Sequence, residues 1–209
     1  MTKYLTEFIG TFFLVLIVGL AATLGSSHAP LAIGAGLMVM VYMGGHISGA
    51  HYNPAVTLAA LMCGKIARGD VVPYLVAQFA GAIAASAVST WLLGQTFAPA
   101  PGPDATGMQA LAVEILFTFA LCLVVLNVAT AKKTAGNSYY GLAIGFTVLA
   151  AAYAGGPISG GAFNPAVGLG PILVKAIVAK GSLANVWLYL VGPGLGAVAA
   201  SRVFSMQET

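Results

Sequence analysis

The stretch SGGAFNPAVGLGP, residues 159–171, places a Ser, an Asn and two Pro residues in a chain made mostly of Ala, Val, Leu and Gly. Nearly the same phrase, SGAHYNPAVTLA, occupies residues 48–59. Glycine and proline interrupt regular helices, so each phrase breaks an otherwise apolar run. A polar, helix-breaking phrase that occurs twice indicates two related halves, each with one broken segment.

The composition excludes a water-soluble protein. Hydrophobic residues make up 59% of the 209 residues and charged residues 6%, against about 25% charged residues in a soluble domain. So few charged side chains cannot cover a surface that faces water, and we expect an integral membrane protein. The net charge of +3 is too small and too dispersed to predict nucleic-acid binding. Cys63 and Cys122 lie in apolar stretches and are expected to be buried, without disulfide or metal chemistry.

Six stretches have the length and apolarity of a membrane-spanning helix, which needs about 20 residues. The predicted spans are Tyr4–Ala22, Leu31–Gly45, Val71–Leu93, Met108–Ala129, Tyr139–Ala154 and Asn185–Phe204. Two shorter apolar pieces, Pro54–Cys63 and Pro165–Ala179, follow the repeated phrase, and an Asn-Pro pair opens each, which is a favourable helix start. The predicted fold class is an all-α membrane protein with six transmembrane helices and two re-entrant half-helices.

The basic residues predict the orientation. If the spans alternate in direction, two lysines, Lys175 and Lys180, fall on the side opposite the termini, and six basic residues fall on the side of the termini. These six are Lys3, Lys65, Arg68, Lys132, Lys133 and Arg202. The positive-inside rule then places both termini in the cytoplasm, with the protein in the plasma (inner) membrane. Glu7 lies inside the first apolar run, so we expect a retained span and not a cleaved signal peptide.

The halves also resemble each other outside the repeated phrase. Residues 6–12, TEFIGTF, are similar to residues 113–119, VEILFTF, and residues 74–82 are more weakly similar to residues 187–193. With three spans in each half, the second copy is inverted in the membrane. We expect one domain over residues 1–209, with inverted repeats at approximately 1–97 and 107–209. Such repeats place a permeation site near the midplane.

The repeated phrase itself predicts a pore. Its glycine-rich segments are too irregular for a helix, and irregular backbone at membrane depth must line a water-filled cavity or be buried in protein. Their carbonyl groups are expected to form a row of acceptors. Asn53 and Asn164 cap the half-helices and direct their NH2 groups into the lumen, where two helix N-termini create a positive potential that repels cations. The residues expected to line these loops are Ser48, Gly49, Ala50, His51, Tyr52, Ser159, Gly160, Ala162 and Phe163.

Several motifs resemble the aquaporin (major intrinsic protein) family. They are the two NPA boxes at residues 53–55 and 164–166, TEFIGTFFLV at 6–15, VEILFTF at 113–119 and WLYLVGP at 187–193. The resemblance covers essentially the whole chain. It implies a homotetramer in the lipid bilayer with one pore in each protomer, which passes water, glycerol or other small neutral solutes without a cofactor.

The resemblance also implies roles for single residues. Glu7 and Glu114 are similar to buried glutamates that hold the half-helix loops; a proton relay is the alternative, but two isolated carboxylates make a poor chain. His51 is similar to the family's loop histidine, and a hydrogen-bonding role is favoured over metal ligation with His46, because no cysteine or acidic partner lies nearby. The central contact between the half-helices is expected from Pro54, Ala55, Pro165 and Ala166.

The chain departs from the family pattern after the second NPA box, where most members have Arg and this chain has Val167. Counting from each Asn, the resemblance places Ile33, Ala152 and Gly161 at the other constriction positions, so the ring is small, apolar and uncharged. We therefore expect a wide pore for water with glycerol-like polyols, urea or neutral hydroxylated metalloids. A mainly water-selective pore, a weakly ion-leaky pore and a hydrophobic gate stay open as alternatives.

Two other functional classes share features of the sequence. A secondary transporter also has inverted repeats and broken helices, but it usually buries charged ion-binding residues, for which Glu7 and Glu114 are the candidates. A structural membrane protein with a closed pore is the other class. The sequence contains no nucleophile–base pair or metal cluster that predicts an enzyme.

Overall fold

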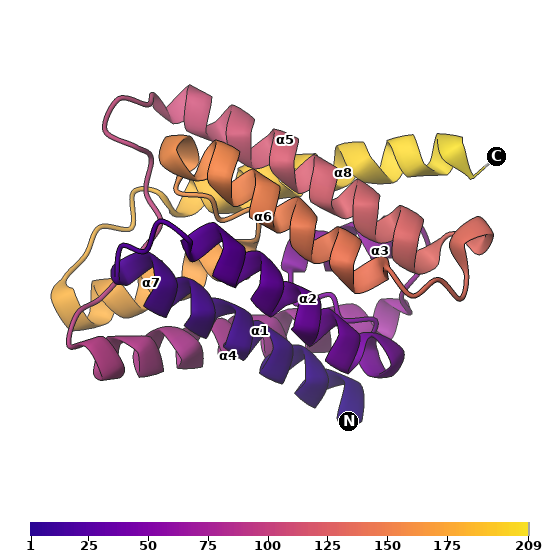
Figure 1. Cartoon of the computed structure of the whole chain (residues 1–209), viewed down its shortest axis with the longest axis horizontal. Coiled ribbons are helices and arrows are strands. Elements are labelled where there is room, and N and C mark those ends of the chain that lie inside the picture. Colours follow the sequence, from indigo (N-terminus) through magenta and orange to yellow (C-terminus); the bar gives the residue numbers. More distant parts are fainter. Residues whose placement is uncertain (209) are drawn as a thin grey trace.

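Each half of the chain folds into three long helices and one short helix. The computed structural model describes residues 1–208, and both termini lie at the same end of the bundle (Figure 1). The first half contains α1 (Thr2–Thr23), α2 (Ala29–Ser48), α3 (Pro54–Met62) and α4 (Arg68–Leu93), and the second half contains α5 (Gly107–Val125), α6 (Tyr140–Ser159), α7 (Pro165–Ala179) and α8 (Val186–Gln207). Six helices among the described residues are long and apolar enough to cross a membrane, which confirms the predicted fold class.

Two predicted spans end too early. Helices α2 and α6 run on to Ser48 and Ser159, so these serines are helical and do not belong to the irregular loops. Each helix ends at a glycine in the left-handed region, Gly49 (φ 84°) and Gly160 (φ 86°). The amide of each glycine bonds to a carbonyl of the last turn, and this cap ends the helix at the first glycine of the repeated phrase.

The predicted fourth span, Met108–Ala129, changes its helical winding near its end. After Val125 the α-helix becomes a π-helical turn, η1 (Leu126–Thr130), followed by a 3-10 turn, η2 (Lys132–Thr134). The side chain of Asn127 bonds to the Leu123 carbonyl and to Gln207 at the end of α8. The α5–α6 connection is thereby attached to the C-terminal helix.

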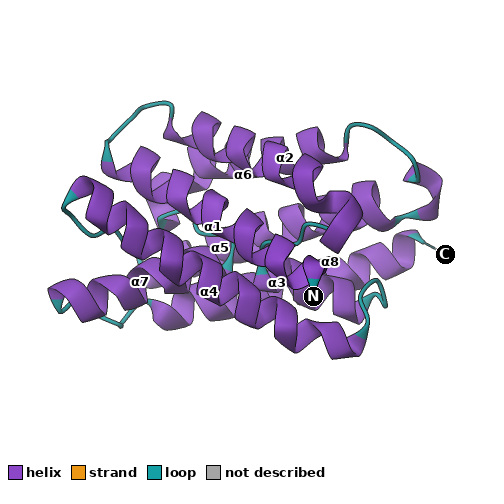
Figure 2. Cartoon of the chain, turned by 90° about the horizontal axis from the view of Figure 1, so that it is seen from below, coloured by secondary structure: helices purple, strands orange, loops and turns teal. Residues whose placement is uncertain are grey.

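The two short helices enter the bundle from opposite ends and meet near its middle (Figures 1 and 2). Each starts where the sequence predicts, because the asparagine before it caps the first turn. The Asn53 Oδ1 atom accepts the Ala55 amide at 2.8 Å, and the Asn164 Oδ1 atom accepts the Ala166 amide at 2.9 Å. Neither half-helix crosses the membrane alone, so the two together span it once.

Glycine lets the long helices approach closely at equivalent places in the two halves. A Cβ atom on Gly81 of α4 would lie 2.5 Å from the Phe8 carbonyl oxygen of α1. A Cβ atom on Gly196 of α8 would lie 2.6 Å from the Ile115 carbonyl oxygen of α5. Small residues at such crossings are the usual way for helices to pack inside a membrane.

Tyrosine contacts establish the register of the weaker repeat. The Tyr74 hydroxyl donates to the Ser48 carbonyl at 2.7 Å, and the Tyr189 hydroxyl donates to the Ser159 carbonyl at 2.6 Å. Tyr74 is therefore equivalent to Tyr189 and not to Trp187, the first residue of the matched stretch. In both halves the last peptide before the loop is anchored to the final long helix.

Glu7, in the second turn of α1, holds the first loop in place. Its side chain is 0% exposed, and its Oε1 atom accepts the Ser48 hydroxyl at 2.7 Å and the His51 amide at 3.0 Å. Its Oε2 atom accepts the Tyr52 amide at 2.7 Å and the Gln78 side chain at 2.8 Å. Because all four partners are donors, an acceptor-only carboxylate satisfies groups that lipid cannot.

Glu114 does the same for the second loop with fewer partners. It accepts the Ser159 hydroxyl at 2.7 Å and the amides of Ala162 and Phe163 at 3.0 and 2.7 Å. The position equivalent to Gln78 is Pro193, which has no donor. The geometry is that of a loop support, because each hydrogen bond that Glu114 accepts comes from the loop or the residue that precedes it.

We expect Gly196→Ala to destabilise the protein by about 1–3 kcal/mol, because the added methyl group meets the backbone of α5. Gly194→Ala in the same helix is the control: its Cβ meets nothing within 4 Å, and the gain in helix propensity makes it neutral or stabilising. Thermal unfolding in detergent measures both variants. Equal effects would contradict a close crossing at Gly196.

We expect Glu114→Ala to cost about 3 kcal/mol or more, because it leaves a hydroxyl and two amides buried without an acceptor. Glu114→Gln keeps one acceptor oxygen and should lose less. The exposed carboxylate Asp104, changed to Asn, is the control and should change the free energy of unfolding by under about 0.5 kcal/mol. A Glu114→Ala protein as stable as this control would rule out the supporting role.

Candidate functional site

A continuous path runs through the chain between the ends of the two half-helices. On the side of the termini, a termini-side vestibule of about 640 Å³ opens between α2, the α3–α4 connection, η1 and α6. It narrows to a lumen of about 30 Å³, which leads to a distal vestibule of about 450 Å³ on the other side. His51, Val125 and Ile144 line both the first vestibule and the lumen. Val18, Gly161 and Val167 line both the lumen and the distal vestibule.

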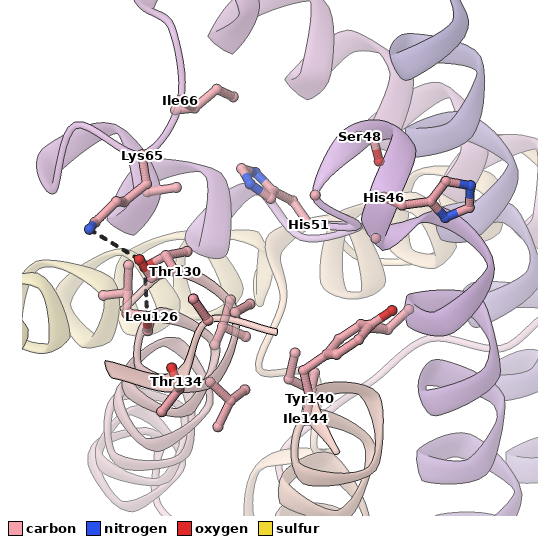
Figure 3. A pocket seen from close by; sticks show the side chains of 18 of the residues that line it. His46, Ser48, His51, Lys65, Ile66, Leu126, Thr130, Thr134, Tyr140 and Ile144 are labelled. Carbon is pink, nitrogen blue, oxygen red and sulfur yellow. Dashed lines mark hydrogen bonds between the residues drawn. The ribbon is translucent and has the colours of Figure 1, made fainter. Parts of the chain in front are cut away.

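The termini-side vestibule has a polar rim. Figure 3 shows Lys65 and Thr130 on one side of it, His46 and Tyr140 on the other, and His51 between them. The Lys65 amino group donates to the Thr130 carbonyl at 3.3 Å and forms an ion pair with Glu208 at 3.0 Å. The positive charge of Lys65 is thus neutralised by the C-terminal segment.

The paired asparagines join the two halves across the centre. The Asn53 Nδ2 group donates to the Phe163 carbonyl at 3.0 Å, and the Asn164 Nδ2 group donates to the Tyr52 carbonyl at 2.9 Å. Both asparagines line the lumen. An amide NH2 group carries two protons, so each side chain uses one to hold the opposite loop and has one for a solute. The sequence predicted the donor in the lumen but not the bond between halves.

The loops before the asparagines have an unusual backbone. Ala50, Tyr52 and Phe163 adopt positive φ angles of 51°, 49° and 50°, a region that residues other than glycine rarely occupy. The Tyr52 amide donates to Glu7 and the Phe163 amide to Glu114, while the Ala50 amide donates to the Ser48 hydroxyl. Within the described part of the chain, six carbonyls on these cavity-lining segments accept no hydrogen bond: those of Gly49, Ala50, His51, Gly160, Gly161 and Ala162. Backbone acceptors need partners, and a passing solute supplies them.

Every residue that lines the lumen has a counterpart at the equivalent position of the other half. Leu14 corresponds to Leu121, for example, and Val56 corresponds to Val167. Paired residues are not always alike in polarity: the counterpart of His51 is Ala162. The His51 Nδ1 atom lies 3.0 Å from the Thr57 hydroxyl, a hydrogen-bonding arrangement within the loop. The sequence analysis did not predict the individual residues of the apolar wall. Aligning the two halves of the chain could have identified them.

Three of the four predicted constriction residues line the lumen, namely Ile33, Gly161 and Val167. Ala152 does not: it is half-buried on α6, one turn beyond Val148, which does line the lumen. Its methyl group extends only one carbon from the backbone and does not reach the path. The ring is apolar and uncharged, as the sequence predicts.

The lumen between the two vestibules has a small volume. A cavity needs a volume of about 10–15 Å³ to hold one water molecule. The lumen, at about 30 Å³, therefore holds on the order of two water molecules. Branched side chains line it, namely Ile33, Val56, Ile144 and Val167. Loss of a large residue after the NPA box therefore does not by itself open the path.

The other predicted loop and tip residues lie around the lumen. Ser159 lines no described cavity, because its hydroxyl faces Glu114 and its carbonyl accepts the Tyr189 hydroxyl. Ser48 is bonded to Glu7 in the same way but lies at the edge of the termini-side vestibule. The remaining tip residues are buried beside the asparagines: Pro54, Ala55, Pro165 and Ala166.

Within residues 1–208, no three His, Cys, Asp or Glu side chains gather where they could hold a metal ion. Cys122 is buried, and the Cys63 thiol donates to the Ser201 carbonyl at 3.7 Å. Both cysteines are free. The site is therefore made of backbone carbonyls, two asparagines, one histidine and an apolar wall.

Comparisons with known proteins agree with this geometry. The chain matches the family model described as major intrinsic protein over residues 1–204. It is 38% identical to aquaporin NIP1-1 of Zea mays over 98% of this chain and 74% of that protein. It is 39% identical to glycerol uptake facilitator protein-like 6 of Lactiplantibacillus plantarum over 96% of this chain and 95% of that protein.

The fold is also similar to a solved structure. The X-ray structure of the aquaglyceroporin from Plasmodium falciparum superposes with a TM-score of 0.87 at 24% identity, covering 97% of this chain and 94% of that one. Two capped half-helices, a continuous lumen and these matches agree. The chain belongs to the major intrinsic protein family and is a passive channel for water and small neutral solutes, not an enzyme.

Proposed function

We propose that this channel carries water together with small uncharged polyols such as glycerol, in single file along one lumen in each chain. The observation that carries this proposal is the division of the lumen into two kinds of wall. One wall consists of unpaired loop carbonyls and the two asparagine amides, and the facing wall consists of Leu, Ile and Val side chains. A polyol has hydroxyl groups for the first wall and a carbon chain for the second.

The narrow lumen sets a condition on this function. A glycerol molecule is larger than the roughly two water molecules that about 30 Å³ holds, so Val167 and its neighbours must change rotamer as it passes. Urea and neutral hydroxylated metalloids have the same combination of donors, acceptors and no charge. The named relatives support a solute channel: one is called a glycerol uptake facilitator-like protein and another an aquaporin.

The proposal includes the membrane, the orientation and the assembly. Basic residues predominate on the side of the termini, which supports cytoplasmic termini in a plasma membrane. Large apolar side chains such as Trp91, Leu116 and Phe146 are exposed on the outside of the bundle, where lipid or a neighbouring protomer covers them. A homotetramer with four separate pores fits this family membership.

We expect Val167→Arg to reduce glycerol flux by roughly tenfold and water flux by less, because a long side chain blocks a larger solute more strongly. Stopped-flow light scattering on proteoliposomes with sorbitol and glycerol gradients measures both fluxes. Val167→Met, which adds bulk without charge or donors, separates size from electrostatics. Equal reductions of the two fluxes, or none, would contradict the position of Val167 at the constriction.

The same vesicles distinguish the competing functions. A channel gives solute flux that rises in proportion to the gradient, whereas a transporter saturates. Water flux without glycerol, urea or metalloid flux would replace the proposal by a water-selective pore. Fluxes no greater than those of lipid alone would indicate a closed or structural protein.

A further inference from the structure

The charge on the lining of the distal vestibule is positive. Within the described residues, Lys175 is the charged member of its lining, which otherwise consists of apolar residues, glycines and the threonines Thr23 and Thr96. Asp104, in the connection between α4 and α5, lines a separate surface cavity beside Gln109. The vestibule opens directly onto Val167 and Gly161, the apolar end of the lumen.

Lys175 lies near the C-terminal end of α7, on the side of that helix that lines the distal vestibule. It follows Val167 by eight residues, so it lies about 12 Å farther along the axis and about 80° around it, and both residues line the distal vestibule. Helical side chains lean toward the helix N-terminus, and Asn164, which caps the N-terminus of α7, lines the lumen. A Cβ atom on Gly181 would meet the Lys175 Cγ atom at 2.7 Å, so this glycine covers the stem of the lysine.

The lysines of the two vestibules differ in their hydrogen bonds and ion pairs. Lys65 lines the termini-side vestibule just after α3, as Lys175 lines the distal vestibule near the end of α7. Lys65 is paired with Glu208 at 3.0 Å and bonded to the Thr130 carbonyl. Within residues 1–208, no hydrogen bond or ion pair engages the Lys175 amino group. Its charge is therefore available to ions that enter the vestibule.

We infer that Lys175 adds a cation-excluding charge at the distal mouth of this pore, beyond the positive potential of the half-helix ends, where the constriction residue Val167 carries no charge. The inference rests on the proposed channel function. Charged groups at a narrow mouth with low-dielectric walls set which ions approach, while uncharged solutes are unaffected. A unit charge about 10 Å from a passing cation changes its local concentration by roughly two- to tenfold, depending on screening.

A test compares proton influx with neutral flux in the same proteoliposomes. Vesicles contain pyranine, and a potassium gradient with valinomycin makes their interior negative, so protons enter through any leak. We expect Lys175→Met to raise the protein-dependent proton influx by roughly fivefold, and Lys175→Glu, which reverses the charge, to raise it further. Water and glycerol fluxes should stay within about twofold of wild type, since neutral solutes do not sense the charge.

Three further variants make the result specific. Lys180→Met removes a lysine that lies on the same side of the chain but lines no described cavity, and it should leak no more than wild type. Lys175→Arg keeps the charge and should also match wild type. Val167→Arg combined with Lys175→Met places a positive side chain at the constriction in place of the lysine. This double variant should return proton influx to the wild-type value.

The outcomes separate the inference from the proposed function. Unchanged proton influx in Lys175→Met and Lys175→Glu, with normal water flux, overturns the role of Lys175 and leaves the channel intact. An equal leak in Lys180→Met, or in Lys175→Arg, also overturns it, because surface charge or packing would then be the cause. Absence of water and glycerol flux through the wild-type protein overturns the proposed function itself.

Discussion

The structure depends on two buried carboxylates that accept hydrogen bonds from broken backbone. Irregular chain at membrane depth exposes amides that lipid cannot satisfy. Glu7 and Glu114 lie on the first helix of each half and bind the loop amides that precede the half-helices. With the amides turned to the glutamates, the carbonyls of the same peptides are left for the lumen. One interaction therefore both stabilises the loops and creates the row of acceptors.

The asparagines complete this arrangement by linking the halves. Each Oδ1 atom caps its own half-helix, and each Nδ2 group bonds to the carbonyl before the other asparagine. The reciprocal bonds hold the two helix tips together at the centre, where both N-termini concentrate positive potential. Because a second proton of each amide is free, the same residues are structural and solute-binding.

The lumen is lined by equivalent positions of the two halves, but the polar groups around it differ between the halves. His51, Thr57 and Gln78 form a connected polar group beside the first loop, while the equivalent positions hold Ala162, Gly168 and Pro193. The vestibules differ in charge as well, since Lys65 is neutralised and Lys175 is not. Selectivity in this chain is thus spread along the path and is not concentrated in one charged ring, because Val167 occupies the usual arginine position.

The sequence alone determined the fold class, the spans, both half-helix starts and the paired asparagines. These follow from apolar length and from Asn-Pro capping, which are local properties that neighbouring residues specify. Tertiary structure alone decided that Ser48 and Ser159 are helical, that Ala152 is too short to reach the path and that branched side chains narrow the lumen. It also decided that Lys175 lines the same vestibule as Val167 and that no ion pair among residues 1–208 engages it. These outcomes depend on which side chains from distant helices meet, and spacing along one chain does not specify such contacts.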